Sequence, residues 1–171
     1  MTVDRAISSA SREDNAKESA RVVNAINPDH LRFRSLYVKR GTTLSEMSDA
    51  GKFETPDEDE IVEEIRMFID HLEGVETTIV SDHILNLLQE LEGKLPQDKQ
   101  KMLDTIDRYL GMPEEERLLF QLGRRGGALT YLDEFEQPAV QDRLRSAKRQ
   151  IEKEVPGGIR EYAREMKKRF V

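Results

Sequence analysis

Residues 31–38 read Leu-Arg-Phe-Arg-Ser-Leu-Tyr-Val, and this stretch decides the fold because its composition and alternation predict a β-strand. Successive side chains of a strand point to opposite faces. Arg32 and Arg34 therefore share one face, and large apolar residues such as Phe33 lie on the other. A buried charge without a partner is costly. On an inner face of the fold, the two guanidinium groups therefore need a partner.

A second strand is predicted at residues 75–80, which are rich in β-branched side chains. Between the two strands we expect a helix that begins with Thr55 as its cap, Pro56 at its first position and Glu58 completing a capping box. Gly74 is expected to end this helix. A strand, a helix and a strand at this separation predict a βαβ crossover with two parallel strands.

The remaining pattern is helical, so the predicted fold class is α/β but helix-dominated, with two short parallel strands in the βαβ unit. We expect a frayed amino terminus at residues 1–10, an α/β segment at 11–81 and an all-helical carboxy-terminal region at 82–171. The other predicted helices span about residues 11–26, 44–50, 81–91, 96–110, 113–123, 138–155 and 158–170.

Two strands make a poor sheet, and parallel strands are normally buried on both faces. The predicted sheet therefore has open edges that can pair with strands from elsewhere. We expect a partner chain or self-association to cover these edges.

The composition excludes several kinds of site. The chain of 171 residues has no cysteine, so it offers no disulfide, zinc–thiolate site, cysteine nucleophile or cysteine-bound iron–sulfur cluster of its own. Its histidines, His30, His71 and His83, are widely spaced and predict no metal-ligand pair. No apolar run is long enough to span a membrane. Residues 1–10 show no secretion signal, so the expected location is cytoplasmic.

The charge of the chain is uneven. Residues 141–171 carry a net charge of +5, whereas the whole chain carries −7. These basic carboxy-terminal helices can be interpreted as a patch for RNA or an acidic partner. The alternative, which the interleaved charges favour, is a solvated helical face.

Four short motifs then follow one another in the order found in one enzyme family. Residues 20–36 (ARVVNAINPDHLRFRSL) and 41–44 (GTTL) are followed by 81–88 (SDHILNLL) and 93–99 (GKLPQDK). Together they resemble the downstream half of a radical S-adenosylmethionine (SAM) protein of the coproporphyrinogen-oxidase-like and tRNA-modifying type. The chain departs from the family pattern at Arg40 and Thr43, where prolines are usual, and at Asp82, where asparagine is usual.

This resemblance implies that residues 11–81 are a fragment of a partial TIM-like barrel. The family's Cys-x3-Cys-x2-Cys loop, which holds its 4Fe–4S cluster, and its SAM-binding strands lie upstream of the matching motifs and are not in this chain. We therefore expect a carboxy-terminal portion of a radical SAM protein of unknown substrate, which binds no cofactor and is inactive alone. The alternative is a non-catalytic helical interaction module that acts as a homodimer or a subunit.

The resemblance also marks candidate binding residues. Arg34 and Arg32 are expected to line the barrel interior, where a guanidinium can bind the SAM carboxylate or an acidic substrate. The alternative for both is a structural ion pair with acidic residues of nearby helices. Gly41 and Thr42 end the same strand, where barrel enzymes place their active sites. Their alternative is a turn that needs glycine at positive φ.

His83 and Asn86 follow the second strand and are expected on the same side as those arginines. His83 can act as a proton donor or a substrate ligand, whereas the alternative is a half-buried histidine beside a helix cap. The glycine- and arginine-rich residues 123–127 can bind phosphate, but without a preceding strand they favour a helix end. The acidic residues 57–60 and 63–64 are predicted to form a solvated face.

Overall fold

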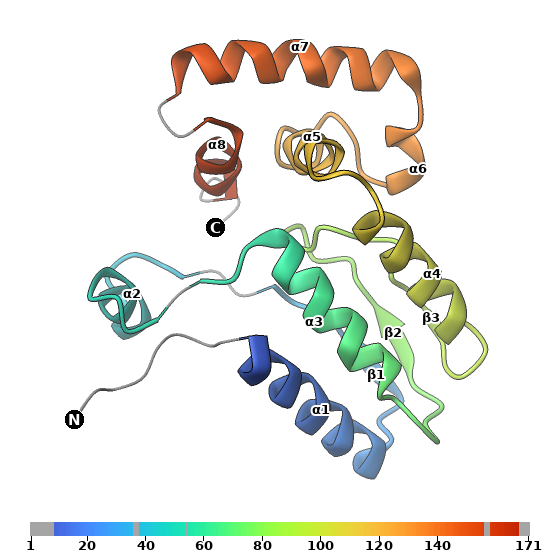
Figure 1. Cartoon of the computed structure of the whole chain (residues 1–171). Coiled ribbons are helices and arrows are strands. Elements are labelled where there is room, and N and C mark those ends of the chain that lie inside the picture. The colour runs from blue at the N-terminus through green and yellow to red at the C-terminus, as the bar shows by residue number, and fades with distance from the viewer. Residues whose placement is uncertain (1–8, 36–37, 54, 156–157, 168–171) are drawn as a thin grey trace.

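The computed structural model describes residues 9–35, 38–53, 55–155 and 158–167, and Figure 1 shows a chain dominated by helices, as predicted. The helices are α1 (Ser9–Ile26), α2 (Thr43–Asp49), α3 (Glu58–Asp70), α4 (Lys99–Leu110), α5 (Glu114–Arg125), α6 (Leu132–Phe135), α7 (Pro138–Glu154) and α8 (Gly158–Lys167). The strands are β1 (His30–Arg32), β2 (Thr78–Val80) and β3 (Gly93–Lys94). None of the helices in the described ranges combines the length and apolarity needed to cross a membrane.

The strands form a mixed sheet in the order β1-β2-β3. β1 and β2 run parallel, with Leu31 opposite Ile79, which confirms the predicted parallel pair. β3 runs antiparallel to β2, with Gly93 opposite Ile79. The expectation of only two strands, with an all-helical region from residue 82, was therefore wrong. β3 was missed because two residues, one of them glycine, carry no strand pattern.

In the part of the chain that the structure describes, helices cover one face of the sheet and leave exposed side chains on the other. α3 lies between α1 and α4 (Figure 1), and Ile79 is fully buried beneath this layer. Phe33 also lies on the helical side, where its ring meets that of Phe68 at 5.9 Å between centroids. His30 and Arg32 are exposed on the opposite face. The predicted alternation along β1 is confirmed, and the arginine side of the sheet is open.

The two edges of the sheet differ. On β3, the main-chain N–H of Lys94 donates to the Asp98 carboxylate at 2.7 Å, and the Asp98 N–H donates to the Lys94 carbonyl at 2.9 Å. The outward backbone groups of Lys94 are thus both satisfied by the turn that follows. β3 therefore offers no free pair of groups to a further strand.

β1, by contrast, keeps an open edge. The Asp29 carbonyl accepts from Thr78 at 2.9 Å, and the Phe33 N–H donates to Val80 at 2.9 Å. Because pairing alternates along a strand, the backbone groups of His30 and Arg32 point away from β2. The prediction of open edges is therefore confirmed for β1 and wrong for β3.

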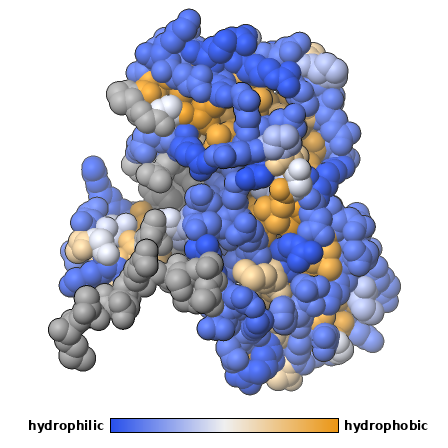
Figure 2. Space-filling model, in the orientation of Figure 1, coloured by the Kyte–Doolittle hydropathy of each residue, from blue (hydrophilic) through white to orange (hydrophobic). Residues whose placement is uncertain are grey.

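The carboxy-terminal helices form a second packed group. α7 crosses over α5 and α8 (Figure 1), and hydrophobic residues show between these helices on an otherwise hydrophilic surface (Figure 2). Lys148 of α7 pairs with Glu115 at 2.5 Å, and Arg160 of α8 pairs with Glu114. Some of the basic side chains of residues 141–171 thus form ion pairs with the acidic first turn of α5. RNA binding by these helices stays a prediction.

Helix α3 begins two residues later than predicted. Asp57, not Thr55, is its cap: the Asp57 carboxylate accepts from the Glu60 N–H at 2.9 Å, and the Glu60 carboxylate accepts from the Asp57 N–H at 2.9 Å. The capping box needs an acidic or amide side chain three residues after the cap, and both candidate positions satisfy this spacing. In the structure, Glu58 lies inside the helix instead and is buried.

The closed edge of β3 generates a stability test. A Cβ atom at Gly93 would lie 2.5 Å from the Cβ of Asp98. Gly93→Ala would therefore push Asp98 away from Lys94 and disturb the hydrogen bonds that close the β3 edge. We expect Gly93→Ala to lower the free energy of unfolding by about 1–3 kcal/mol. The control Lys94→Ala keeps the backbone contacts and is expected to change it by less than about 0.5 kcal/mol. Equal urea midpoints for the two variants would contradict this description of the edge.

Candidate functional site

The open face of the sheet carries a paired arginine at the carboxyl end of β1. The Arg32 guanidinium donates to both carboxylate oxygens of Asp82, each at 2.6 Å, and both side chains are exposed. These hydrogen bonds to Arg32 lower the pKa of Asp82. The ion-pair interpretation of Arg32 is therefore confirmed, although its partner follows β2 instead of lying on a helix.

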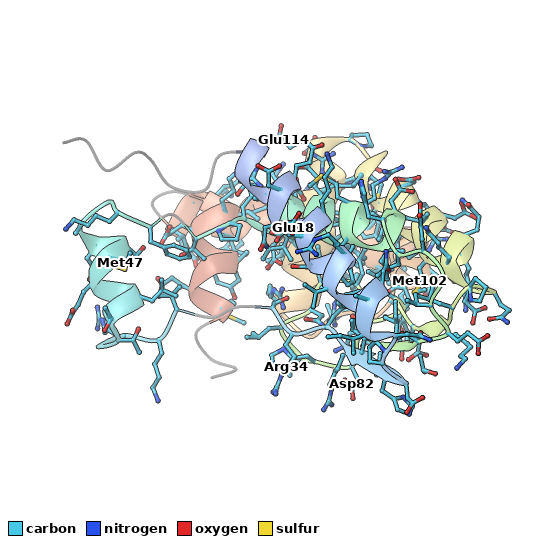
Figure 3. All side chains as sticks on the ribbon, turned by 90° about the horizontal axis from the view of Figure 1, so that it is seen from below. Glu18, Arg34, Met47, Asp82, Met102 and Glu114 are labelled. Carbon is cyan, nitrogen blue, oxygen red and sulfur yellow. The ribbon has the colours of Figure 1, made fainter. Side chains whose placement is uncertain are left out.

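Arg34 lies two residues further along the same face and, unlike Arg32, is not paired with Asp82. It is exposed, and it makes no hydrogen bond or ion pair with any other described residue. Figure 3 shows Arg34 and Asp82 close to the same margin of the molecule, with their side chains directed outward. Within the described residues, the guanidinium of Arg34 is thus exposed and unpaired on the open face.

The side chain of Asn86 fixes the backbone on either side of Arg34. Its amide nitrogen donates to the Phe33 carbonyl at 3.0 Å, and its oxygen accepts from the N–H and the hydroxyl of Ser35, each at 3.0 Å. The amide nitrogen also donates to the Ser81 hydroxyl at 3.1 Å. Asn86 is buried, so it has a structural role: it joins the residues that follow β1 to Ser81, which follows β2.

His83 lies next to these residues and carries an unused nitrogen. Its Nδ1 atom is buried and has no hydrogen-bond partner among the described residues. Burial, and then the positive charges of Arg34 and Arg32, lower the pKa of His83, while Asp82 opposes them. The ring is therefore neutral near pH 7, and it can accept or donate a hydrogen bond according to its tautomer.

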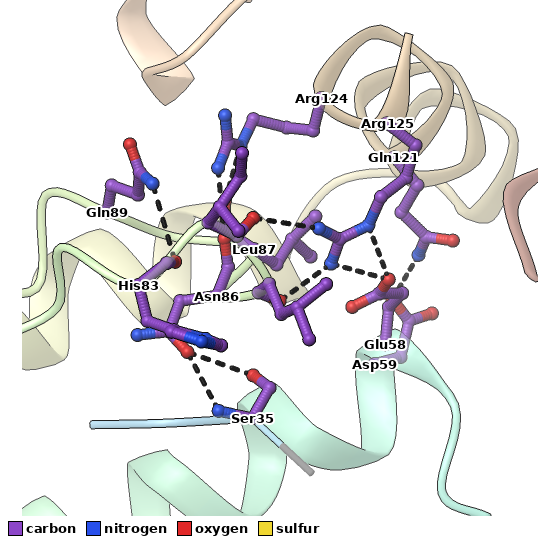
Figure 4. Close-up of polar contacts among 12 residues, drawn as sticks. Ser35, Glu58, Asp59, His83, Asn86, Leu87, Gln89, Gln121, Arg124 and Arg125 are labelled. Atoms are coloured by element: carbon purple, nitrogen blue, oxygen red, sulfur yellow. Dashed lines mark hydrogen bonds and ion pairs between the residues drawn. The ribbon is translucent and has the colours of Figure 1, made fainter. Parts of the chain in front are cut away.

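The segment that carries His83 and Asn86 is not the predicted helix. Residues 81–92 contain turns and irregular backbone in place of the helix expected at 81–91. Figure 4 shows that Arg124 and Arg125, at the end of α5, reach this segment. Arg124 donates to the carbonyls of Asn86 at 3.0 Å and Leu87 at 2.9 Å, so side-chain donors of a distant helix bond these carbonyls in place of the N–H groups of the expected helix.

Arg125 contacts the same segment and is also paired with an acid. It donates to the carbonyls of Ile84 at 3.3 Å and Leu85 at 2.9 Å, and its guanidinium lies 2.7 Å from a Glu58 carboxylate oxygen. Arg125 is 1% exposed. The prediction that residues 57–60 form a solvated face was therefore wrong for Glu58. Residues 123–127 end a helix, as favoured, but the use of their arginines inside the protein was missed.

Gly41 and Thr42 do not join this site. Gly41 has φ of +78°, and its N–H donates to the Ser45 hydroxyl at 3.1 Å. Thr42 caps α2 by accepting from the Ser45 N–H at 3.3 Å. Figures 1 and 3 both show α2 set apart from the sheet. The turn interpretation of these two residues is confirmed, and the structure brings together only Arg32, Arg34, His83 and Asn86 among the candidates.

No protein-family model, curated protein or solved structure matches this chain. The chemistry of the site is therefore interpreted from its own residues. Within the described ranges, no group of three or more histidine or acidic side chains is arranged to hold a metal ion. What the geometry offers is a free guanidinium, a neutral imidazole and a paired Arg32–Asp82 couple on one open face.

The charges around His83 generate a titration test. In an NMR pH titration, we expect the His83 imidazole to have a pKa below the ordinary value of about 6.5. Arg34→Ala removes a neighbouring positive charge and is expected to raise that pKa. Because protonation is disfavoured in the folded state, the stability contributed by His83 is present above pH 6.5 and is lost as the pH falls through its lowered pKa.

The control for this titration is Arg66→Ala on α3, which removes an arginine paired with Asp107 at 2.5 Å. It is expected to leave the His83 pKa unchanged. A wild-type His83 that titrates at or above the ordinary value would show that the imidazole is not desolvated as described.

Proposed function

We propose that this chain forms one wall of a binding site for a carboxylate-bearing ligand, as the carboxy-terminal portion of a radical SAM protein. The observation that carries the proposal is the exposed guanidinium of Arg34. It lies without a described partner at the carboxyl ends of two parallel strands, beside the neutral ring of His83. Ligands of open α/β sheets bind outside the carboxyl ends of the strands.

The chemistry of the face favours a carboxylate. A guanidinium presents a planar fork of donors that matches the two oxygens of a carboxylate. Arg32 already shows this geometry, since it holds Asp82 with two bonds of 2.6 Å. Arg34 can make the same pair with a ligand, and a neutral His83 can add a hydrogen bond without a further charge. The carboxylate of SAM or of an acidic substrate fits this arrangement.

The radical SAM part of the proposal rests on the four ordered motifs and on the shape of the sheet. Two of the motifs supply the residues that build the open face, namely β1 and the His83 segment, and a third supplies the turn that closes the β3 edge. The open β1 edge is where the further strands of a partial barrel would continue. The chain has no cysteine, so it does not fit a thiolate-bound cluster by itself. In this proposal, another segment supplies that cluster.

A titration with succinate tests the carboxylate site. We expect succinate to shift the NMR signals of the Arg34 side chain and the His83 ring, and the uncharged diamide succinamide to leave them unmoved. Hydrogen bonds to charged groups contribute about 1.5–3 kcal/mol. Arg34→Ala is therefore expected to weaken succinate binding by roughly 10–100-fold, and Arg34→Lys less.

The control for the titration is Arg21→Ala, which removes an exposed arginine of α1 that pairs with Glu18 at 2.8 Å. Its affinity for succinate is expected to equal that of the wild type. Binding that is equally strong for succinamide, or unchanged in Arg34→Ala, would refute the carboxylate site.

Reconstitution with iron and sulfide tests the dependence on another segment. Because cysteine is absent, the purified chain is expected to assemble no stoichiometric 4Fe–4S cluster and to cleave no SAM under reducing conditions. Iron content, absorbance and product analysis measure this. A stoichiometric cluster together with reductive SAM cleavage would contradict the proposal that the chain cannot act alone.

The open β1 edge favours a second candidate function, a non-catalytic interaction module that self-associates through this edge. The outward N–H of His30 would then pair with a second copy, and His30→Pro would remove it without touching the bonds to β2. In this case light scattering should show a concentration-dependent dimer in the wild type and a monomer in His30→Pro. A wild-type chain that is monomeric at every concentration counts against this function.

A further inference from the structure

The last turn of α5 places two neighbouring arginines inside the protein. Arg124 is 9% exposed and Arg125 is 1% exposed. Burial, and then the charge of Arg125, lower the pKa of Arg124. Two buried cations side by side are costly unless most of their donors are bonded. Their position in the fold therefore has to be explained by the groups they bind.

Those groups are four consecutive main-chain carbonyls of the segment after β2. Arg125 donates to Ile84 at 3.3 Å and Leu85 at 2.9 Å, and Arg124 donates to Asn86 at 3.0 Å and Leu87 at 2.9 Å. The segment has no helical ladder of its own over these residues. Two side chains that lie 37 to 41 residues further along the chain thus hold this backbone, together with two local bonds of 2.8 Å, from the Asn86 N–H to the His83 carbonyl and from the Ser81 hydroxyl to the Leu88 carbonyl.

The two guanidinium groups are themselves fixed. Arg125 is held by the Glu58 carboxylate, which its Nε reaches at 2.9 Å, and Glu58 belongs to the first turn of α3. Arg124 is held on its other side by the Leu129 carbonyl at 3.4 Å. The segment is thus clamped against a helix end that cannot shift without breaking a buried ion pair.

The clamped segment carries the residues that shape the open face. His83 directly precedes Ile84, the first carbonyl in the clamp. The Asn86 side chain bonds Phe33 and Ser35, which flank Arg34 in the sequence. A shift of the clamped carbonyls would therefore move His83 directly and move Arg34 through Asn86.

We propose that Arg124 and Arg125 are positioning residues for the carboxylate site: through the carbonyls of residues 84–87 they set the distance between His83 and Arg34. This inference rests on the proposed function, and it adds two residues that lie on the far side of the segment from the ligand. Figure 4 shows this arrangement, with the two arginines and His83 on opposite sides of the segment. Neither arginine needs to touch the ligand.

The test replaces each arginine by methionine, which keeps much of the bulk and removes the donors. In Arg125→Met and Arg124→Met we expect succinate binding to weaken about tenfold and the His83 pKa to rise toward its ordinary value, because the ring is no longer held in its desolvated position. Arg125→Lys retains a cation but places its donors on a single nitrogen, so it is expected to recover part of the succinate affinity and part of the pKa lowering. Urea unfolding and the NMR spectrum establish that each variant is folded.

Arg117→Met is the matched control. Arg117 lies on the same helix, is half-buried and pairs with Asp59 at 2.9 Å, and its bonds go to Asp59, Leu110 and Met112 instead of the segment. It is expected to lose stability while keeping the wild-type succinate affinity and His83 pKa. A merely structural role for Arg124 and Arg125 predicts the same behaviour for all the variants.

The possible outcomes separate the two proposals. Failure of the wild type to bind succinate overturns the proposed function, yet the His83 pKa still tests the positioning role. Folded Arg125→Met and Arg124→Met proteins with an unchanged His83 pKa and unchanged succinate affinity overturn the positioning role. If Arg125→Met does not fold, the decision rests on Arg124→Met, which leaves the ion pair with Glu58 in place.

Discussion

The ion pair between Arg125 and Glu58 joins three parts of the chain that lie far apart in the sequence. The two side chains are 1% and 9% exposed, and removing one partner of such a buried pair costs about 3–5 kcal/mol because the other charge is left uncompensated. The pair connects the end of α5 to the start of α3. Through the Ile84 and Leu85 carbonyls, it also connects both to the segment after β2.

The neighbouring Asp59 extends this junction. It accepts hydrogen bonds from the Tyr109 hydroxyl at 2.5 Å, from Gln121 at 2.8 Å and from Arg117 at 2.9 Å. Burial, and then the Asp59 carboxylate, raise the pKa of Tyr109. The first turn of α3 is thus the point at which α4, α5 and the sheet segment meet.

The sequence predicted the elements that depend on local or alternating patterns. The parallel pairing of β1 and β2, the covered side of Phe33 and the open side of Arg32 follow from strand periodicity. The helix expected at residues 81–91 was wrong, and the carbonyls of residues 84–87 instead bond Arg124 and Arg125 of a distant helix, which no local pattern indicates. Glu58 was misjudged for the same reason, since its partner lies 67 residues away. The local sequence predicts that an acidic residue in the first turn of a helix is solvated, and it gives no sign of so distant a partner.

The step that links the buried arginines to Arg34 runs through Asn86, whose side chain bonds Phe33 and Ser35. A double-mutant cycle measures this most directly, with the NMR chemical shift of the Arg34 guanidinium as the observable in wild type, Arg124→Met, Asn86→Ala and the double variant. We predict that the change in the Arg34 chemical shift caused by Arg124→Met becomes much smaller once the Asn86 side chain is absent, because the two residues belong to one hydrogen-bonded chain. Changes in the Arg34 chemical shift that simply add in the double variant would contradict a route through Asn86.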